Sequence, residues 1–150
     1  MRVVFMGSPE FAVPSLEALV REKYDIAAVY TQPDKPAGRG LTLTASPVKK
    51  AALSLGLTVC QPATLKGEAA AAELAALNPD VVIVAAYAKI LPETILGIPK
   101  FRCLNIHPSL LPGYRGASPV PAAILAGDAF TGVSIILMEK GLDTGPVLAQ

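Results

Sequence analysis

The chain has 150 residues, 52% of them hydrophobic, and its 13 basic and 12 acidic side chains leave a formal net charge of +1. A charge so close to zero gives no indication of nucleic-acid binding, so any contact with RNA has to be local. The longest apolar run, Val81 to Ala88, is far shorter than the roughly 20 residues of a membrane-spanning helix. We therefore expect one compact cytoplasmic domain without a membrane segment or signal peptide.

Strand and helix patterns alternate along the chain, which predicts an α/β domain with a doubly wound, mostly parallel sheet. The expected elements are, in order, a strand at 2–6, a helix at 13–20, a strand at 26–30, a helix at 46–56, a strand at 57–60, a helix at 68–77, strands at 81–86 and 101–106, a helix at 118–127, and a C-terminal antiparallel pair at 132–138 and 146–149. The segment from Thr31 to Ala45 shows neither the pattern of a helix nor that of a strand. It is interpreted as a functional or mobile loop.

Two cysteines and a single histidine argue against a disulfide and a metal centre. Cys60 and Cys103 lie in or beside apolar runs, where a thiol usually behaves as a small buried hydrophobic group. Their spacing from His107 does not match the paired ligands of a zinc site. We expect free thiols and no metal.

Ligands of open α/β sheets bind beyond the carboxyl ends of the strands, and three places there attract attention. The turn at Gly7 lacks the glycine spacing of dinucleotide sites and needs only to lead into the first helix. Asn105 and His107 are two residues apart in an extended segment, so their side chains share one face. Asp143 lies in a glycine-flanked turn. These side chains could converge as oxyanion donor, base and orienting group, although a capping asparagine, a surface histidine and an ordinary hairpin turn are open alternatives.

A serine nucleophile at Ser109, activated by His107, is a further alternative. The G-x-S-x-G elbow of serine hydrolases is missing, and the loop offers no evident oxyanion hole. We therefore do not expect covalent catalysis.

The run Asn-Ile-His-Pro-Ser-Leu-Leu-Pro at 105–112, followed by Tyr-Arg-Gly at 114–116 and Gly-Leu-Asp-Thr-Gly at 141–145, resembles the signature of the 10-formyltetrahydrofolate-dependent formyltransferases. Two further segments, at 5–12 and at 32–40 with 46–49, resemble the branch of that family that formylates methionyl-tRNA. The resemblance covers the whole chain and implies the formyltransferase fold, with its Rossmann-like start.

Particular site residues follow from this resemblance. It implies that Asn105, His107 and Asp143 are catalytic. It implies that seven residues bind the co-substrate 10-formyltetrahydrofolate: Lys89, Ile90, Leu91, Ser109, Leu110, Leu111 and Pro112. It places Lys35 and Arg39 in a basic loop that contacts the methionyl initiator tRNA. We expect a monomer without a metal. Because members of this branch are longer, we also expect that residues 1–150 are a truncated catalytic domain and that a C-terminal tRNA-contacting domain is absent.

The expected reaction moves a formyl group from N10 of the folate to an amine. Asn105 and His107 would donate to the developing oxyanion, while Asp143 would orient the imidazole and relay a proton through water. We expect the three side chains to converge because each follows a strand that ends on the same side of the sheet. The alternatives are formylation of an amine on a sugar nucleotide or ribonucleotide, and a non-catalytic ligand-binding module. The basic loop at 32–40 favours the tRNA acceptor.

Overall fold

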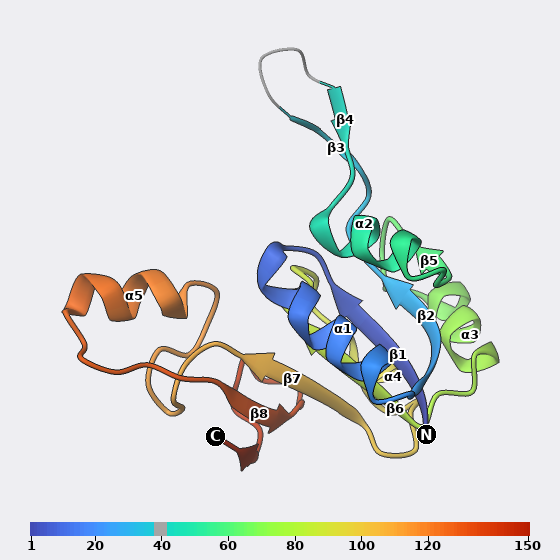
Figure 1. Cartoon of the computed structure of the whole chain (residues 1–150). Helices are drawn as coiled ribbons and strands as arrows, with labels where there is room; N and C mark the ends of the chain where they lie inside the picture. Colours follow the sequence, from blue (N-terminus) through green and yellow to red (C-terminus); the bar gives the residue numbers. More distant parts are fainter. Residues whose placement is uncertain (38–41) are drawn as a thin grey trace.

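The computed structural model describes residues 1–37 and 42–150 and has a mixed, mostly parallel sheet with helices on both faces (Figure 1). Within these residues the main sheet has seven strands in the order β5-β2-β1-β6-β7-β8-β9. Their bounds are β1 (Arg2–Gly7), β2 (Asp25–Tyr30), β5 (Val59–Cys60), β6 (Val81–Ala85), β7 (Cys103–His107), β8 (Ser134–Leu137) and β9 (Val147–Ala149). In this order all pairs from β5 to β7 are parallel. Strand β8 runs antiparallel to β7, and β9 runs antiparallel to β8. The predicted fold class and C-terminal antiparallel pair are confirmed.

The helices lie close to their predicted positions. They are α1 (Val13–Arg21), which follows a single 3-10 turn (Glu10–Ala12), α2 (Pro47–Ser54), α3 (Glu68–Ala76), the short α4 (Glu93–Leu96) and α5 (Pro119–Ala126). The start of α2 is capped as its sequence predicts, because the Ser46 hydroxyl accepts a hydrogen bond from the Lys49 amide at 3.0 Å. The helix α4 was not predicted, since four residues are too few to show a period. No helix in the described ranges is long and apolar enough to span a membrane.

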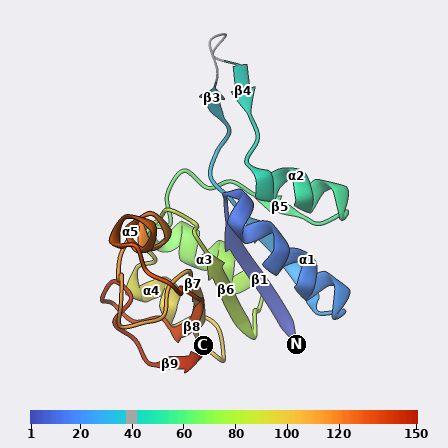
Figure 2. The ribbon, with the colours of Figure 1, turned by 60° about the vertical axis from the view of Figure 1, so that its left-hand side comes forward.

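Two apolar cores hold the helices against the two faces of the sheet. Side chains alternate along β1, so Val4 and Met6 pack on the side of α3 and α4, where Leu74 lies. Phe5 points the other way and packs with Leu16 of α1. Figure 2 shows α1 and α2 on one side of β1 and β6, and α3 and α4 on the other. Burial on both faces explains why the central strands are apolar without alternation.

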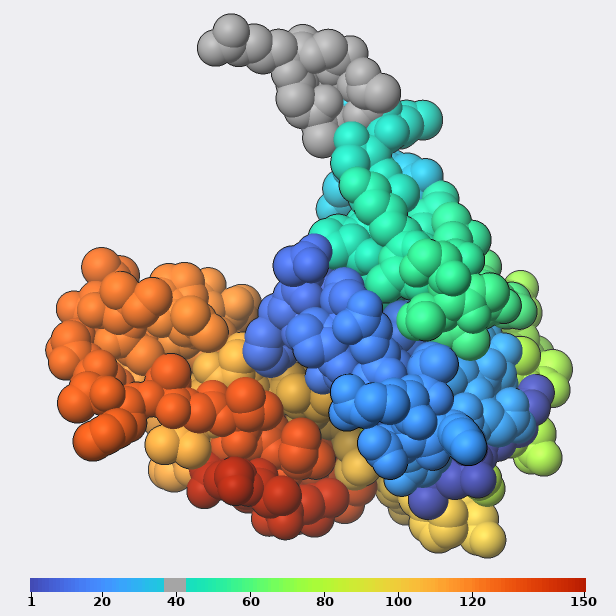
Figure 3. All heavy atoms as spheres, in the orientation of Figure 1, coloured from blue at the N-terminus to red at the C-terminus, as the bar shows by residue number. Residues whose placement is uncertain are grey.

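The segment from Thr31 to Ala45, interpreted as a functional or mobile loop, contains two short strands that the sequence did not predict. Strands β3 (Lys35–Ala37) and β4 (Thr42–Thr44) pair antiparallel and project away from the sheet beyond α2 (Figure 1). In Figure 3 the cyan residues of this segment extend from the green surface of α2. Lys35, Pro36 and Leu43 are exposed. Because these residues do not form a buried face, the sequence lacks the alternation of apolar and polar residues by which a strand is recognised. Arg39, which was predicted to contact tRNA, lies outside the described residues.

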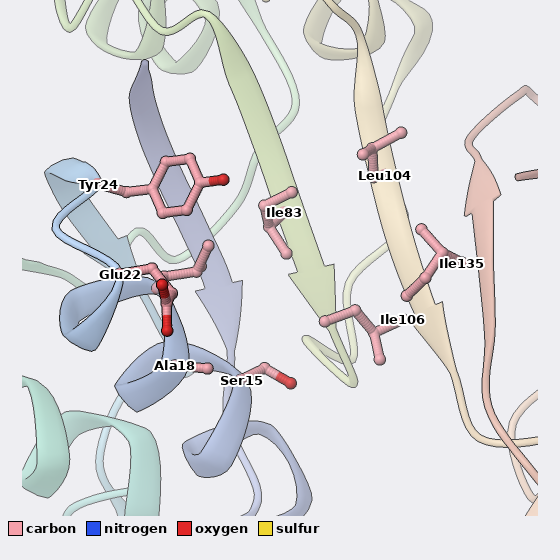
Figure 4. Close-up of a pocket in the computed structure, with 9 residues that line it drawn as sticks. Ser15, Ala18, Glu22, Tyr24, Ile83, Leu104, Ile106 and Ile135 are labelled. Carbon is pink, nitrogen blue, oxygen red and sulfur yellow. The ribbon is translucent and has the colours of Figure 1, made fainter. Parts of the chain in front are cut away.

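One part of the sheet carries an apolar groove. Ile83, Leu104, Ile106 and Ile135 of neighbouring strands form its floor, and α1 forms one wall (Figure 4). The groove has a volume of about 300 Å³. Because side chains alternate along β7, it lies on the opposite face of the sheet from Asn105, and it is therefore separate from the predicted catalytic residues.

Candidate active site

Strand β7 carries Asn105 and His107 on one face of the sheet. Asn105 is opposite Val84 of the parallel strand β6, and His107 is opposite Ser134 of the antiparallel strand β8. The His107 side chain is buried, with 3% of the residue exposed. Asn105 lies within the strand, as the predicted bounds 101–106 require, and His107 is its last residue, so the sheet itself fixes the direction of both side chains.

The carboxylate of Asp143 joins these residues. Its Oδ1 accepts a hydrogen bond from Asn105 Nδ2 at 3.1 Å, and its Oδ2 accepts one from the Gly116 amide at 3.0 Å. The same Oδ2 lies 3.5 Å from His107 Nδ1. The side chains of His107 and Asp143 are 4% and 8% exposed, so this charge is largely withdrawn from water. The structure therefore brings the three predicted catalytic side chains into one cluster.

The reason given for that convergence was wrong, however. Asp143 follows β8, which runs antiparallel to β7, so the end of β8 lies beside the start of β7. The turn that carries Asp143 (residues 138–146) folds back to reach Asn105 and His107. We call this segment the Asp143 turn.

Glycine permits the tight path of the Asp143 turn. A Cβ at Gly145 would lie 1.8 Å from the carbonyl oxygen of Leu137, closer than any real contact. Asp143 itself has a φ of 50°, in the left-handed region that asparagine and aspartate tolerate better than most residues. The glycine spacing in the sequence thus reflects steric demands of the turn.

The second ring nitrogen of His107 also faces an acceptor. Nε2 is 2.9 Å from the backbone carbonyl oxygen of Tyr114, in the loop that follows β7. Both ring nitrogens therefore face acceptors, the Tyr114 carbonyl at Nε2 and the Asp143 carboxylate at Nδ1. Tyr114 contacts His107, and Gly116 contacts Asp143, through backbone atoms. Side-chain chemistry does not reveal such contacts.

Ser109 does not pair with His107. Its buried hydroxyl donates to the Gly113 carbonyl at 2.6 Å, which closes the turn of its own loop. Ser134, which sequence reasoning missed, donates from its hydroxyl to the Ser109 carbonyl at 2.7 Å and accepts from the Leu111 amide at 3.0 Å. Ser134 is two residues before Ile136 in the predicted strand and therefore shares its face, which was the available signal. The serine-nucleophile alternative receives no support from this geometry.

The loop from Ser109 to Pro112, predicted to contact the folate, presents its side chains in different directions. Leu111 is buried, while Leu110 and Pro112 are exposed. The loop starts two residues after His107 and is held to β8 through Ser134. Its backbone therefore has a fixed position beside the cluster.

The other predicted folate residues follow β6 and also differ from one another. Lys89 Nζ donates to the backbone carbonyls of Pro62 and Ala63, the latter at 3.0 Å. Burial of the Lys89 ammonium lowers its pKa, and the nearby charge of Lys35 adds to that effect. Leu91 packs in the core, whereas Ile90 is 84% exposed.

The backbone between β6 and Lys89 is unusual. Ala86 and Ala88 have φ values of 48° and 61°, in the left-handed region that costs an alanine about 1 kcal/mol or more. Tyr87 between them is buried, and its carbonyl accepts a hydrogen bond from Gln32 Nε2 at 2.9 Å. This segment ends the strand next to Asn105, and strained backbone of this kind is concentrated at functional sites.

Within the described residues, no cluster of three or more histidine, cysteine, aspartate or glutamate side chains could hold a metal ion. Both cysteines are free.

The chain belongs to the formyl transferase family, whose model matches residues 1–150. It is 58% identical over 150 residues to a methionyl-tRNA formyltransferase of Marinobacter nauticus and 57% identical to one of Dehalococcoides mccartyi, and it covers 48% of each. The chain therefore spans about half the length of the curated relatives it matches. Among solved structures, it is similar to a phosphoribosylglycinamide formyltransferase of Bacillus halodurans, with a TM-score of 0.78, 27% identity, and coverage of 100% of this chain and 78% of that one. The resemblance seen in the sequence is confirmed.

Proposed function

We propose that this chain forms the catalytic part of a transferase that moves a formyl group from 10-formyltetrahydrofolate to the amino group of methionyl initiator tRNA during translation initiation. The observation that carries this proposal is the buried cluster of Asn105, His107 and Asp143. It is supported by the close similarity of the whole chain to methionyl-tRNA formyltransferases. Bacterial translation takes place in the cytoplasm, which makes this the proposed location.

In this reaction the amine nitrogen bonds to the formyl carbon, the bond from that carbon to N10 breaks, and the proton lost by the amine ends on N10. Asn105 Nδ2 has two hydrogens, and Asp143 accepts one of them. The other can be donated to the formyl oxygen as negative charge develops there. For His107 to act as a second donor, its Nε2–H has to turn from the Tyr114 carbonyl, which it faces here, to the formyl oxygen. Loss of one such donor typically costs about 3 kcal/mol of barrier.

Asp143 has two proposed tasks. Its carboxylate holds the Asn105 amide and stabilises the His107 ring when the ring is protonated, because one oxygen faces each group. It also gives the proton from the amine a base within the site, through an intervening water. These tasks require neither a covalent intermediate nor a change in the sheet.

The co-substrate supplies the formyl group, and two segments fit its folate part. The left-handed turn at Ala86 to Ala88 ends the hydrogen-bonded ladder of β6 next to Asn105, where backbone donors and acceptors suit the polar edge of a pterin. The loop from Ser109 to Pro112 begins beside His107 on the neighbouring strand. We therefore place 10-formyltetrahydrofolate between these two segments.

For the acceptor, we propose that Lys35 on the β3–β4 hairpin contacts RNA phosphates. We further propose that residues 1–150 form a catalytic domain, monomeric as isolated, and that most of the tRNA contacts belong to a C-terminal domain outside it. A net charge of +1 leaves little electrostatic affinity for RNA, so we expect weak tRNA binding by this chain.

A formyl-transfer assay tests the proposal directly. The chain is incubated with 10-formyltetrahydrofolate and either methionyl initiator tRNA or phosphoribosylglycinamide, the acceptor of the second candidate function. We expect formylation of the tRNA and none of the ribonucleotide. Formylation of the ribonucleotide alone would favour the second candidate. Folate binding is measured by calorimetry in parallel, and a folded chain that neither binds folate nor transfers formyl would refute the proposed function.

A further inference from the structure

The β3–β4 hairpin is tied together where it leaves the sheet. Thr31, which enters the hairpin, is fully buried, and its hydroxyl lies 2.6 Å from the hydroxyl of Ser46, which leaves it. Three residues after Thr31, Asp34 Oδ2 accepts a hydrogen bond from Lys49 Nζ of α2 at 2.7 Å. The two legs of the hairpin are therefore joined at Thr31 and Ser46, and the leg that enters the hairpin is also tied to α2.

The same side chains connect the hairpin to neighbouring strand ends. Gln61, just after β5, donates from Nε2 both to Asp34 Oδ1 and to the backbone carbonyl of Gln32, each at 2.8 Å. Gln32 in turn donates to the carbonyl of Tyr87 after β6, at 2.9 Å, and its amide donates to the Ser8 hydroxyl after β1. We call residues 31–34, 46–49 and Gln61 the hairpin root. It touches the carboxyl ends of four adjacent strands.

We propose that Asp34 is a positioning residue, which fixes the direction of the β3–β4 hairpin relative to the segment from Ala85 to Lys89. This inference rests on the proposed function, because it relates the segment assigned to RNA to the segment assigned to the folate. Asp34 carries the only carboxylate of the hairpin root as defined above, and both of its oxygens are engaged by different elements.

The charges in the hairpin root support this role. The side chains of Lys49 and Asp34 are 19% and 30% exposed, so their ion pair is partly shielded from water. The hydrogen bonds from Lys49 and Gln61 lower the pKa of Asp34, which keeps the carboxylate ionised. The Lys49 ammonium is consequently neutralised within the protein, which makes it a structural cation and leaves phosphate contacts to Lys35.

Hydrogen exchange tests the positioning role without any assumption about activity. In Asp34→Asn, peptides that cover 31–37 and 42–46 are expected to exchange about tenfold faster than in the wild type, while β1 and β6 are unchanged. Asp25→Asn is the matched control, because Asp25 pairs with Arg2 at 2.7 Å in an exposed ion pair at the other end of the sheet. Unchanged exchange in Asp34→Asn would overturn the proposal. A second variant, Lys49→Met, should give the same increase, with no further increase in the double variant.

Kinetics separate positioning from a purely structural role. Asp34→Asn should raise the KM for methionyl-tRNA about tenfold and leave kcat and the KM for the folate within twofold, because the chemical groups remain in place. A fall in kcat alone, with both KM values unchanged, would mean a loss of folded enzyme and would overturn the proposal. A folded wild-type chain that neither binds folate nor transfers formyl would instead refute the proposed function, and the exchange experiment would then decide the positioning role alone.

Discussion

Replacing Asp143 with asparagine removes one charge from the cluster and almost no volume. In the native protein both carboxylate oxygens accept hydrogen bonds, one from Asn105 Nδ2 and one from the Gly116 amide. An asparagine side chain has one oxygen and one NH2 group, so in either orientation it places a donor against a donor. It also removes the negative charge 3.5 Å from His107 Nδ1.

The size of the effect follows from these contacts. A hydrogen bond to a charged group contributes about 1 kcal/mol more than a neutral one, and an unpaired buried donor costs about 1–3 kcal/mol. We therefore expect Asp143→Asn to lower the free energy of unfolding by about 2–4 kcal/mol. Misplacement of the Asn105 and His107 donors should raise the barrier by about 3 kcal/mol, which slows formyl transfer roughly 100-fold.

The assay is single-turnover transfer of formyl from 10-formyltetrahydrofolate to methionyl initiator tRNA, with urea unfolding of the same samples. Asp25→Asn, with the same chemical change in an exposed side chain, should keep its rate within twofold and lose less than about 1 kcal/mol. If Asp143→Asn is stable and less than fivefold slower, the carboxylate does not hold the donors and the proposed mechanism fails.

Three other expectations concern stability and reactivity. Gly145→Ala places a Cβ against a backbone carbonyl and should lower the free energy of unfolding in urea by about 2–3 kcal/mol, whereas Gly97→Ala, with ordinary contacts, should cost less than about 1 kcal/mol. Burial raises the pKa of Cys103 to about 12, so mass spectrometry should find this thiol alkylated by iodoacetamide at pH 8 only after unfolding. The hydrogen bond from Lys49 lowers the pKa of Asp34, so its contribution to stability is present above the unfolded pKa of about 4 and is lost as the pH falls through the lower native value. Below about pH 4, wild-type stability should approach that of Asp34→Asn, and parallel stability curves would contradict this reasoning.

The sheet and its helices were predictable because each has a buried face that constrains its sequence. The apolar run from Val81 to Ala85 is explained by a strand buried on both faces. Ser46 is explained by its position at the start of a helix. The hairpin at 35–44 was missed for the opposite reason. The side chains of Lys35, Pro36 and Leu43 face solvent, and the contacts at the base of the hairpin join residues distant in the sequence.

The candidate site was predictable in its members and not in its geometry. The spacing of Asn105 and His107 and the glycine turn of Asp143 made them candidates, and the resemblance to the formyltransferases chose them over the structural alternatives. The backbone groups of Tyr114 and Gly116, which complete the surroundings of His107 and Asp143, leave no mark in side-chain chemistry. The path of the Asp143 turn depends on the direction of β8, and the sequence of a short strand does not disclose its direction.

That path has a consequence for how the protein loses activity. The Asp143 turn is connected to the sheet through β8 and β9, two short strands at its edge, while Asn105 and His107 belong to a strand nearer the centre. Edge elements of this kind open locally at a lower free energy than the central strands. Heat or denaturant should therefore release the carboxylate while the parallel core is still folded, so that inactivation precedes the loss of circular dichroism. The strands that open first are then β8 and β9, and β8 adjoins β7 of the parallel core, which opens last.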